Sequence, residues 1–319
     1  MKVLVTGGAG FIGSNFIKYI LREHPSYKII NLDKLTYAGN LKNLSDIKNN
    51  KNYKFIKGDI CDKKLADRVI KECDVVVNFA AESHVDRSIV NPDEFLKTNV
   101  FGTYTLLETV KKYRNKRFLQ ISTDEVYGSI KKDFFKETDM LTPSSPYSAS
   151  KASADLLAMS YYTTYKLPVL ITRSSNNFGP NQYPEKIIPL FITNILREKK
   201  VPVYGDGLNI RDWIYVEDNC RAIDLVLHKG KEGEIYNIGA NNEKSNLDLT
   251  KIILKEMGKS SDYIEYVKDR PGHDRRYAVD CSKIRLLGFK LEYEFDSALR
   301  KTINWYKNNK SWWLPLIKK

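Results

Sequence analysis

The sequence predicts an α/β fold in which helices cover both faces of a doubly wound parallel sheet and a smaller α/β lobe follows at the C-terminal end. Three observations support this class. Short apolar, β-branched runs alternate with helical segments, a glycine-rich turn follows the first run, and the alternation weakens after about Arg173. Parallel strands need crossover connections, and helical crossovers cover both faces of a sheet.

Seven runs are predicted to be buried strands because each is short, apolar and rich in β-branched residues. They span residues 3–5, 28–32, 53–56, 74–79, 118–121, 168–172 and 235–238. The last run lies beyond the point where the alternation weakens, so we expect the chain to return once to the sheet. The predicted sheet domain therefore comprises residues 1–174 plus about 212–240, and the lobe comprises about 175–211 and 241–319.

Length, charge and cysteine content are those of a folded cytoplasmic protein. A chain of 319 residues can bury a large core, and its net charge of +13 is spread along the sequence rather than gathered in a basic arm. This argues against nucleic-acid binding and suits an anionic small molecule. The four cysteines lack metal-site spacing. We expect no signal peptide, and the apolar run at 187–196 is too short to cross a membrane.

The first strand ends in the glycine-rich segment TGGAGFIG, residues 6–13, and a helical pattern follows it. Glycines at a strand-to-helix turn let the backbone approach a pyrophosphate, which then lies at the positive helix N-terminus, as in a Rossmann-type domain. Two spacings fit the segment, one with Gly8, Gly10 and Gly13 and one with Gly7, Gly10 and Gly13. Spacing alone leaves both open.

Asp33 closes the second strand, twenty residues after Gly13. A carboxylate there can accept hydrogen bonds from an adenosine ribose and would repel a 2′-phosphate, which favours NAD over NADP. Lys34 beside it weakens the preference. Asp59, at the end of the third strand, is a second candidate for contact with the adenine, although a simple turn role explains it nearly as well.

Tyr147 and Lys151 are four residues apart in YSASK, so a helix places them on one face. A nearby ammonium is expected to lower the pKa of the phenol, which then acts as a base toward a sugar hydroxyl, while the same ammonium holds a nicotinamide ribose. The spacing is common on surface helices. It gains weight only beside the glycine-rich turn and Asp33.

Thr123, Asp124 and Glu125 follow the fifth strand, at the carboxyl end where open α/β sheets bind ligands. Adjacent carboxylates at a strand end also occur in solvated turns. Their functional interpretation is a paired acid and base, with one carboxyl protonated and the other ionised. Oxidation of a sugar at C4 makes the C5 proton acidic and places the C6 hydroxyl β to the carbonyl, so such a pair can remove water.

The glycine-rich turn and the Tyr/Lys pair together resemble the extended short-chain dehydrogenase/reductase family, whose members combine TGxxGxxG with YxxxK. Longer stretches resemble its nucleotide-sugar 4,6-dehydratases: AAESHVDRS at 80–88, STDEVYG at 122–128, RSSNNFGPNQYPEKIIP at 173–189, GDGLNIRDWIYVED at 205–218 and RPGHDRRYAVD at 270–280. The resemblance implies an NAD-dependent hydro-lyase of deoxysugar biosynthesis. Its substrate would be dTDP-glucose and its product the 4-keto-6-deoxy sugar.

The resemblance also implies residue roles. Tyr147 would remove the C4 hydroxyl proton, Glu125 the C5 proton, and Asp124 would protonate the departing C6 oxygen, with Thr123 on the sugar O4 and Lys151 beside the cofactor. The residues implied to bind NAD are Gly7, Gly10, Phe11, Ile12, Gly13, Asp33, Lys34, Leu35, Thr36, Asp59, Ile60, Ala80, Ala81, Thr98, Tyr147, Lys151 and Asn177. Those implied to bind the nucleotide sugar are Ser83, Thr123, Asn176, Lys186, Ile187, Pro202, Tyr204, Arg211, Asn246, Arg270 and His273.

Several alternatives stay open on sequence grounds. A nucleotide-sugar 4-epimerase or a UDP-glucuronate decarboxylase shares the cofactor site but needs neither Asp124 nor Glu125. An NAD-sensing regulator could dispense with Tyr147 or Lys151, and an RNA-binding protein would show a basic stripe. We expect no metal, since His84 and His273 show no ligand partners in sequence. The resemblance implies a homodimer through two helices, near 100–113 and 148–165.

Overall fold

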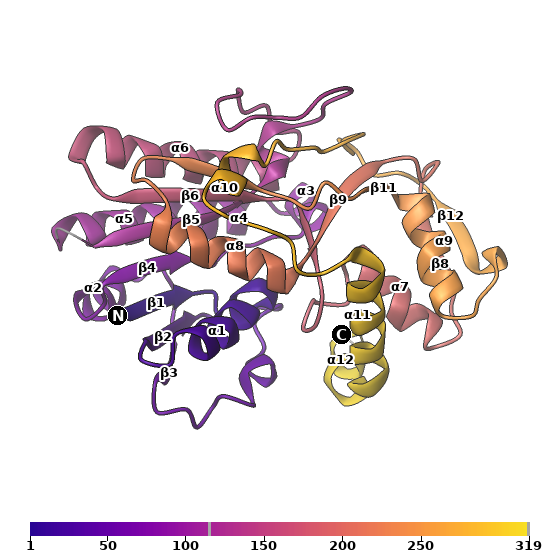
Figure 1. Cartoon of the computed structure of the whole chain (residues 1–319), viewed down its shortest axis with the longest axis horizontal. Coiled ribbons are helices and arrows are strands. Elements are labelled where there is room, and N and C mark those ends of the chain that lie inside the picture. The colour runs from indigo at the N-terminus through magenta and orange to yellow at the C-terminus, as the bar shows by residue number, and fades with distance from the viewer. Residues whose placement is uncertain (114–115, 318–319) are drawn as a thin grey trace.

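The computed structural model describes residues 1–113 and 116–317, and its sheet domain matches the predicted class (Figure 1). All seven predicted strands are present and lie in one parallel sheet, in the order β10-β6-β5-β4-β1-β2-β3. Their bounds are β1 Lys2–Thr6, β2 Lys28–Asp33, β3 Tyr53–Lys57, β4 Val75–Asn78, β5 Arg117–Thr123, β6 Val169–Ser174 and β10 Ile235–Ile238. The strand order reverses between β1 and β4, where ligands of such sheets bind.

Helices cover both faces of this sheet, as the alternating pattern predicts. On one face lie α1 (Phe11–Glu23) and α8 (Val216–Lys229). On the other lie α2 (Lys63–Lys71), α5 (Thr103–Lys112) and α6 (Pro146–Tyr165). Shorter helical segments lie between these helices along the chain: η1 Leu41–Leu44, α3 Val85–Val90, α4 Asp93–Phe95, η2 Leu96–Gly102 and η3 Asp124–Tyr127.

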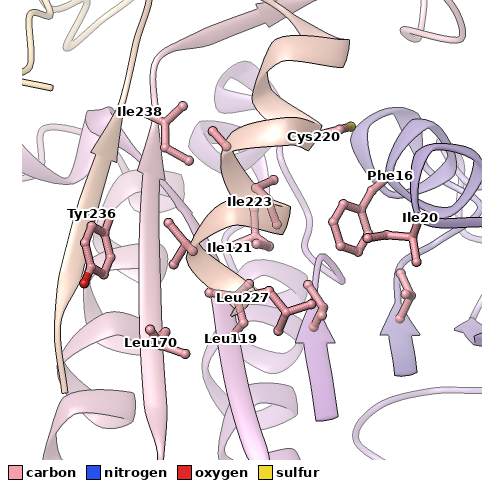
Figure 2. Packing of buried hydrophobic residues seen from close by; sticks show 14 of the residues in the cluster. Phe16, Ile20, Leu119, Ile121, Leu170, Cys220, Ile223, Leu227, Tyr236 and Ile238 are labelled. Atoms are coloured by element: carbon pink, nitrogen blue, oxygen red, sulfur yellow. The ribbon is translucent and has the colours of Figure 1, made fainter. Parts of the chain in front are cut away.

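The two faces of the sheet bury separate apolar cores. Figure 2 shows the core under α1 and α8, where Phe16 and Ile20 of α1 and Ile223 and Leu227 of α8 pack against side chains of the sheet. Leu119 of β5 is fully buried in this core. Alternate residues of the same strands, such as Phe118, point into the second core. Burial on both sides explains why the strands read as continuous apolar runs.

The C-terminal lobe has its own core and two small sheets. One sheet has the order β11-β9-β7, and the other pairs β12 with β8. The lobe elements are β7 Asn176–Phe178, α7 Ile187–Ile195, β8 Val201–Tyr204, β9 Ile210–Tyr215, β11 Glu243–Ser245, α9 Asn246–Glu256, η4 Ser261–Tyr263, β12 Ile264–Val267, α11 Phe295–Asn308 and α12 Lys310–Ile317. Trp213, Leu249 and Tyr306 are among the buried residues that join them.

The backbone passes between sheet and lobe more than once. After β6 it builds β7, α7, β8 and β9 in the lobe, returns through α8 and β10 to the sheet, and leaves again for β11 and α9 (Figure 1). α10 (Ser282–Leu286) then packs against β10. The predicted boundary between residues 211 and 212 falls inside β9. The exact division into domains stays a prediction.

The cysteines and the helices bear on disulfide bonding and on membrane insertion. All four cysteines are free thiols. Across the described part of the chain, no helix combines the length and the apolarity that a membrane span requires.

Candidate functional site

One cavity lies along the carboxyl ends of the sheet strands and extends toward the lobe. Its walls come from the segments that follow strands β1 to β6 and from the segment before α7. The lining residues are Gly7, Gly10, Phe11, Ile12, Gly13, Leu32, Asp33, Lys34, Thr36, Ala38, Gly39, Gly58, Asp59, Ile60, Phe79, Ala80, Ala81, Glu82, Ser83, Thr98, Ile121, Ser122, Thr123, Asp124, Glu125, Tyr147, Lys151, Ser174, Ser175, Asn176, Asn177, Gln182, Tyr183, Glu185 and Lys186.

The glycine-rich turn is built on Gly7, Gly10 and Gly13, which resolves the two spacings. Gly7 has φ +67°, and a Cβ there would lie 2.6 Å from the Ala80 backbone nitrogen. A Cβ at Gly13 would lie 2.6 Å from the Gly7 carbonyl oxygen. These three glycines line the cavity, whereas Gly8 packs against Asn31 in the interior. Gly10 caps α1 without a side-chain hydrogen bond, so the helix N-terminus offers backbone N–H groups to an anion.

Asp33 is buried at the cavity wall and fixed by two backbone donors. Its Oδ2 accepts from the Ala9 N–H at 2.9 Å and its Oδ1 accepts from the Leu35 N–H at 2.7 Å. Burial raises the pKa of this carboxyl, and the two N–H donors oppose the rise. Beyond it, Lys34 Nζ forms a 2.9 Å ion pair with Asp59. The Lys34 ammonium is therefore neutralised by a carboxylate next to the cavity.

Of the predicted NAD contacts, Leu35 alone is absent from the cavity lining. It has a left-handed φ of 58° and serves to hold Asp33 instead. Several buried oxygens in the walls have no hydrogen-bond partner among the described residues: those of Ser122, Ser175, Asn176, Asn177 and Gln182. A buried polar group without a partner costs free energy. Such a wall therefore fits a polar ligand that supplies the missing donors.

The end of β5 places the two carboxylates side by side. Thr123 ends the strand, and its Oγ1 accepts from the Glu125 N–H at 3.3 Å while it donates to Asp124 Oδ1 at 3.2 Å. Burial, followed by the charge of Glu125, raises the pKa of Asp124 well above its usual range. Burial also raises the pKa of Glu125, but Lys186, Arg270 and Arg211 oppose that rise. Both pKa values are raised, and Asp124 is the carboxyl better suited to hold a proton, because more cations oppose the rise at Glu125.

Helix α6 holds Tyr147 and Lys151 against the cavity. It begins with Pro146 after a Ser145 cap whose hydroxyl and that of Ser148 satisfy each other's backbone N–H groups. Burial lowers the pKa of Lys151 to about 8, and its Nζ donates to the Ile121 carbonyl at 2.6 Å. The expectation that Lys151 lowers the Tyr147 pKa is wrong for this arrangement. Burial and the charge of Glu125 raise that pKa.

A buried polar network continues beneath Lys151. Asp155, one further turn along α6, is fully buried and pairs with Arg173 Nε at 2.9 Å. Arg173 Nη1 then donates to the Tyr127 hydroxyl at 2.8 Å, which donates to Asn237 Oδ1 at 2.8 Å. The Asp155 charge opposes the fall in the Lys151 pKa that burial causes.

Three predicted cations surround the carboxylates from the lobe side. Lys186 lines the cavity, and its Nζ donates to the Ser83 carbonyl at 2.9 Å. Arg211 is buried, donates to the Asp274 carbonyl at 2.9 Å and lies 4.1 Å over the Tyr277 ring. Arg270 Nη1 contacts Asp86 at 3.2 Å, while its Nε is a buried donor with no partner among the described residues.

The other predicted sugar contacts divide into two groups. Ser83, Thr123 and Asn176 line the cavity together with Lys186. The remaining ones lie outside its walls on the lobe: Ile187, Pro202, Tyr204, Arg211, Asn246, Arg270 and His273. Tyr204 and His273 meet edge to face at 6.2 Å, and His273 Nδ1 bonds Asp269 at 2.6 Å.

Sequence reasoning missed several polar residues of the walls, including Glu82, Ser122, Ser175, Gln182 and Glu185. Most lie inside the quoted stretches, so their neighbourhood was identified while their own exposure to the cavity was not. Burial raises the pKa of Glu82, and the Thr36 hydroxyl opposes the rise. Only the fold reveals which side chains of these stretches face inward.

Away from the cavity, the structure brings together His24, Asp224 and His228, whose donor atoms could hold a metal ion. His24 Nε2 lies 3.0 Å from Asp224 Oδ2, and His228 Nδ1 lies 3.0 Å from Asp224 Oδ1. The Tyr27 hydroxyl contacts His228 Nε2 at 2.9 Å. These contacts link α1 and α8. The expectation that the activity needs no metal stays a prediction.

The comparisons extend over nearly the entire chain. The sequence model of the family described as GDP-mannose 4,6 dehydratase matches residues 4–302. The low-salt glycan biosynthesis protein of Haloferax volcanii is 54% identical over 96% of this chain and 98% of its own length. The dTDP-glucose 4,6-dehydratase of Streptomyces niveus is 50% identical over 99% of this chain and 96% of its own. The crystal structure of dTDP-glucose 4,6-dehydratase from Bacillus anthracis in complex with NAD has a TM-score of 0.93, 54% identity and 99% coverage of both chains.

Proposed function

The chain belongs to the GDP-mannose 4,6-dehydratase family, and on this premise we propose that it is an NAD-dependent hydro-lyase that converts dTDP-glucose into dTDP-4-keto-6-deoxy-glucose. One observation carries the proposal. Asp124 and Glu125 face the same cavity as Tyr147 and Lys151, so the groups for oxidation and for elimination share one site. The full-length relatives with this activity support the same assignment.

NAD is the cofactor that this cavity fits. The turn at Gly7, Gly10 and Gly13 offers free helical N–H groups for the pyrophosphate, and the buried Asp33 carboxylate suits a ribose with a free 2′-hydroxyl. When bound, NAD supplies a nicotinamide ring that takes hydride from C4 of the sugar and returns it to C6. We assign NAD contacts to the predicted residues that line the cavity, and a supporting role to Leu35.

Tyr147 is the proposed base for the first step. It takes the proton of the C4 hydroxyl while the C4–H bond breaks, and Lys151, one helical turn away, is assigned to hold the nicotinamide ribose. Burial and the charge of Glu125 raise the Tyr147 pKa, so positive charge near the ring would favour the phenolate. Thr123 also lines the cavity, and we assign its hydroxyl the hydrogen bond to the sugar O4.

Glu125 and Asp124 then act as base and acid in the elimination. Glu125 takes the C5 proton, which the C4 carbonyl has made acidic, and the electron pair forms the C5–C6 double bond. Asp124 gives its proton to the C6 oxygen, which leaves as water. The different environments of the two carboxyls support these roles, because the pKa of Asp124 is raised well above its usual range and Glu125 is near three cations that oppose the rise of its own pKa.

The lobe side of the cavity is the proposed site of the sugar diphosphate. Lys186, Arg211 and Arg270 supply three positive charges, and the free Arg270 Nε offers a donor for a phosphate oxygen. The remaining assigned contacts are Ser83, Asn176, Ile187, Pro202, Tyr204, Asn246 and His273. We retain the predicted division into an NAD-binding domain, residues 1–174 with about 212–240, and a sugar-binding lobe.

A homodimer is part of the proposal. The outer surface of α3, η2 and α6 exposes apolar side chains, among them Val90 (85%), Leu96 (52%), Phe101 (66%) and Leu156 (63%). Exposed apolar side chains gathered on neighbouring elements are typical of protein interfaces. Light scattering of the wild-type protein should give twice the mass of one chain, and the Phe101→Glu variant should give the mass of a single chain.

We further propose a cytoplasmic location and no nucleic-acid partner, since both proposed ligands are small cytoplasmic metabolites.

The deciding experiment is mass spectrometry of the nucleotide sugar after incubation with the purified protein, without added metal. dTDP-glucose is compared with the UDP, GDP and CDP sugars. We expect the loss of one water from dTDP-glucose alone. Conversion of a UDP sugar to its C4 epimer with unchanged mass would contradict the roles of Asp124 and Glu125, and the absence of any reaction would favour an NAD-sensing regulator.

A further inference from the structure

Three side chains from distant parts of the sequence meet at the rim of the cavity. Tyr37 lies in the loop after β2, Arg87 in α3, and Glu185 in the segment before α7. The Tyr37 hydroxyl donates to Glu185 Oε1 at 2.8 Å. Arg87 Nη2 lies 3.4 Å from Glu185 Oε2, and the Arg87 guanidinium lies 3.8 Å over the Tyr37 ring. The mechanism uses none of these three groups.

The contacts join two separate segments that both line the cofactor cavity. Thr36, Ala38 and Gly39, on both sides of Tyr37, belong to one segment, and Tyr183, Glu185 and Lys186 belong to the other. Tyr37 also meets Tyr183 edge to face at 5.3 Å. The hydrogen bond therefore ties a loop beside Asp33 to a segment that lies 148 residues further along the chain.

The central pair is well shielded, which makes its hydrogen bond strong. The Glu185 side chain is 16% exposed, and His84 Nε2, whose side chain is 17% exposed, lies 3.9 Å from its carboxylate. Arg87 is half exposed, so its ion pair contributes less than the bond from Tyr37. Hydrogen bonds to charged groups contribute more to stability than neutral ones.

We infer that Tyr37, Glu185 and Arg87 form a clasp that holds the cofactor cavity closed and slows the release of NAD. The inference rests on the proposed function, in which the cofactor is restored within every turnover and has no need to leave. For NAD to leave, the loop around Tyr37 must separate from the segment around Glu185. Both contacts of Glu185 must then break.

The test is the release rate of bound NADH from the full-length protein, followed by its fluorescence after a chase with excess NAD. Tyr37→Phe removes only the hydroxyl and keeps the ring against Arg87 and Tyr183. We expect release to become about tenfold faster, the equivalent of one hydrogen bond to a charged group. Glu185→Gln removes the charge at the partner and should accelerate release to a similar extent.

Tyr27→Phe is the matched control. Its hydroxyl bonds His228 on the α1–α8 surface, outside the cavity lining, and its loss should leave the release rate unchanged. A Tyr37→Phe protein that releases NADH at the wild-type rate would overturn the clasp, as would equal acceleration in Tyr27→Phe. If Tyr37→Phe does not fold, the NADH release rate of Glu185→Gln tests the clasp instead.

The outcome separates the clasp from the proposed function. Dehydration of dTDP-glucose by the wild type together with unchanged release in both variants refutes the clasp alone. Faster release from a protein that does not dehydrate dTDP-glucose refutes the proposed function and supports the clasp. A second readout follows from dilution: Tyr37→Phe should need added NAD to recover activity after dilution, and the wild type should not.

Discussion

The two halves of the cavity are constructed differently. In the half that fits NAD, the contacts come from short segments directly after strands, and much of the wall is backbone, as at Gly7 and Gly10. In the half assigned to the sugar diphosphate, Lys186 lines the cavity, and the long side chains of Arg211 and Arg270 approach Glu125 from lobe segments outside the cavity walls. A backbone site is specified by local sequence, whereas a convergent site is specified by the tertiary fold.

The largest expected effect is at Tyr147, where the two halves meet. Tyr147→Phe removes the proposed base and should reduce turnover roughly 10⁴-fold, at the upper end of the range for general base catalysis. It should also block reduction of bound NAD by dTDP-glucose, which absorbance at the NADH band measures. NADH formation at the wild-type rate would remove Tyr147 from the oxidation step.

The next effect separates the sugar half from the cofactor half. Glu125→Gln should reduce water loss roughly 10²- to 10³-fold, because the C5 proton loses its base, while slow reduction of bound NAD continues. Asp124→Asn is the comparison variant. Since the raised pKa of Asp124 keeps this acid protonated, the wild-type elimination step should slow as pH rises through that pKa. Full dehydration by Glu125→Gln would contradict the proposed role.

A substitution in the glycine turn tests the backbone half. Gly7→Ala combines a left-handed φ with a Cβ 2.6 Å from the Ala80 nitrogen. The free energy of unfolding should therefore fall by about 3 kcal/mol, and the protein should lose bound NAD. Gly258 has φ +68°, and a Cβ added there would meet no atom within 4 Å. Gly258→Ala therefore measures the backbone strain alone, about 1–2 kcal/mol. Equal losses in both variants would show that the close contact at Gly7 is unimportant.

The smallest effect lies outside both halves, in the cluster of His24, Asp224 and His228. The Asp224 hydrogen bond raises the pKa of His228, so its stabilisation is present below about pH 6.5 and is lost as pH rises through the folded value. Burial raises the pKa of Asp224, but hydrogen bonds from both histidines outweigh burial, so the pKa is lowered overall. The stabilisation by the Asp224 carboxylate is therefore lost in acid. In thermal melts, the wild type should be more stable than Asp224→Asn by less than about 1 kcal/mol. This difference in stability should be greatest between about pH 4 and 6.5. A stability difference between the wild type and Asp224→Asn that grows above pH 8 would contradict this prediction.

The sequence allowed prediction of the sheet and of the backbone half of the site. Strands such as β1 and β5 are buried on both faces, so apolar runs reveal them directly. The choice between Gly7 and Gly8 needed the structure, because it depends on which glycine meets Ala80. The Tyr147 pKa was predicted in the wrong direction because spacing on a helix shows proximity to Lys151 but neither burial nor the charge of Glu125.

The side-chain half of the site was reached by resemblance rather than by pattern. Nothing in the local sequence shows that Arg211 and Arg270 approach the same carboxylate, since their segments are brought together by β9 and the loop after β12. Glu185 lies next to the predicted Lys186, yet its contact with Tyr37 spans 148 residues. Long-range contacts of this kind have no signature in a single sequence.

The return of the chain to β10 has a mechanical consequence. Because α10 packs against the edge strand β10 between two lobe segments, a force applied at the C-terminal end reaches the sheet through α10 before it reaches β10. The backbone also crosses between sheet and lobe five times, between β6 and β7, between β9 and α8, between β10 and β11, between β12 and α10, and between α10 and α11. Grafting the lobe of a relative with another substrate would therefore require five splice junctions, so specificity is more readily changed by individual side chains.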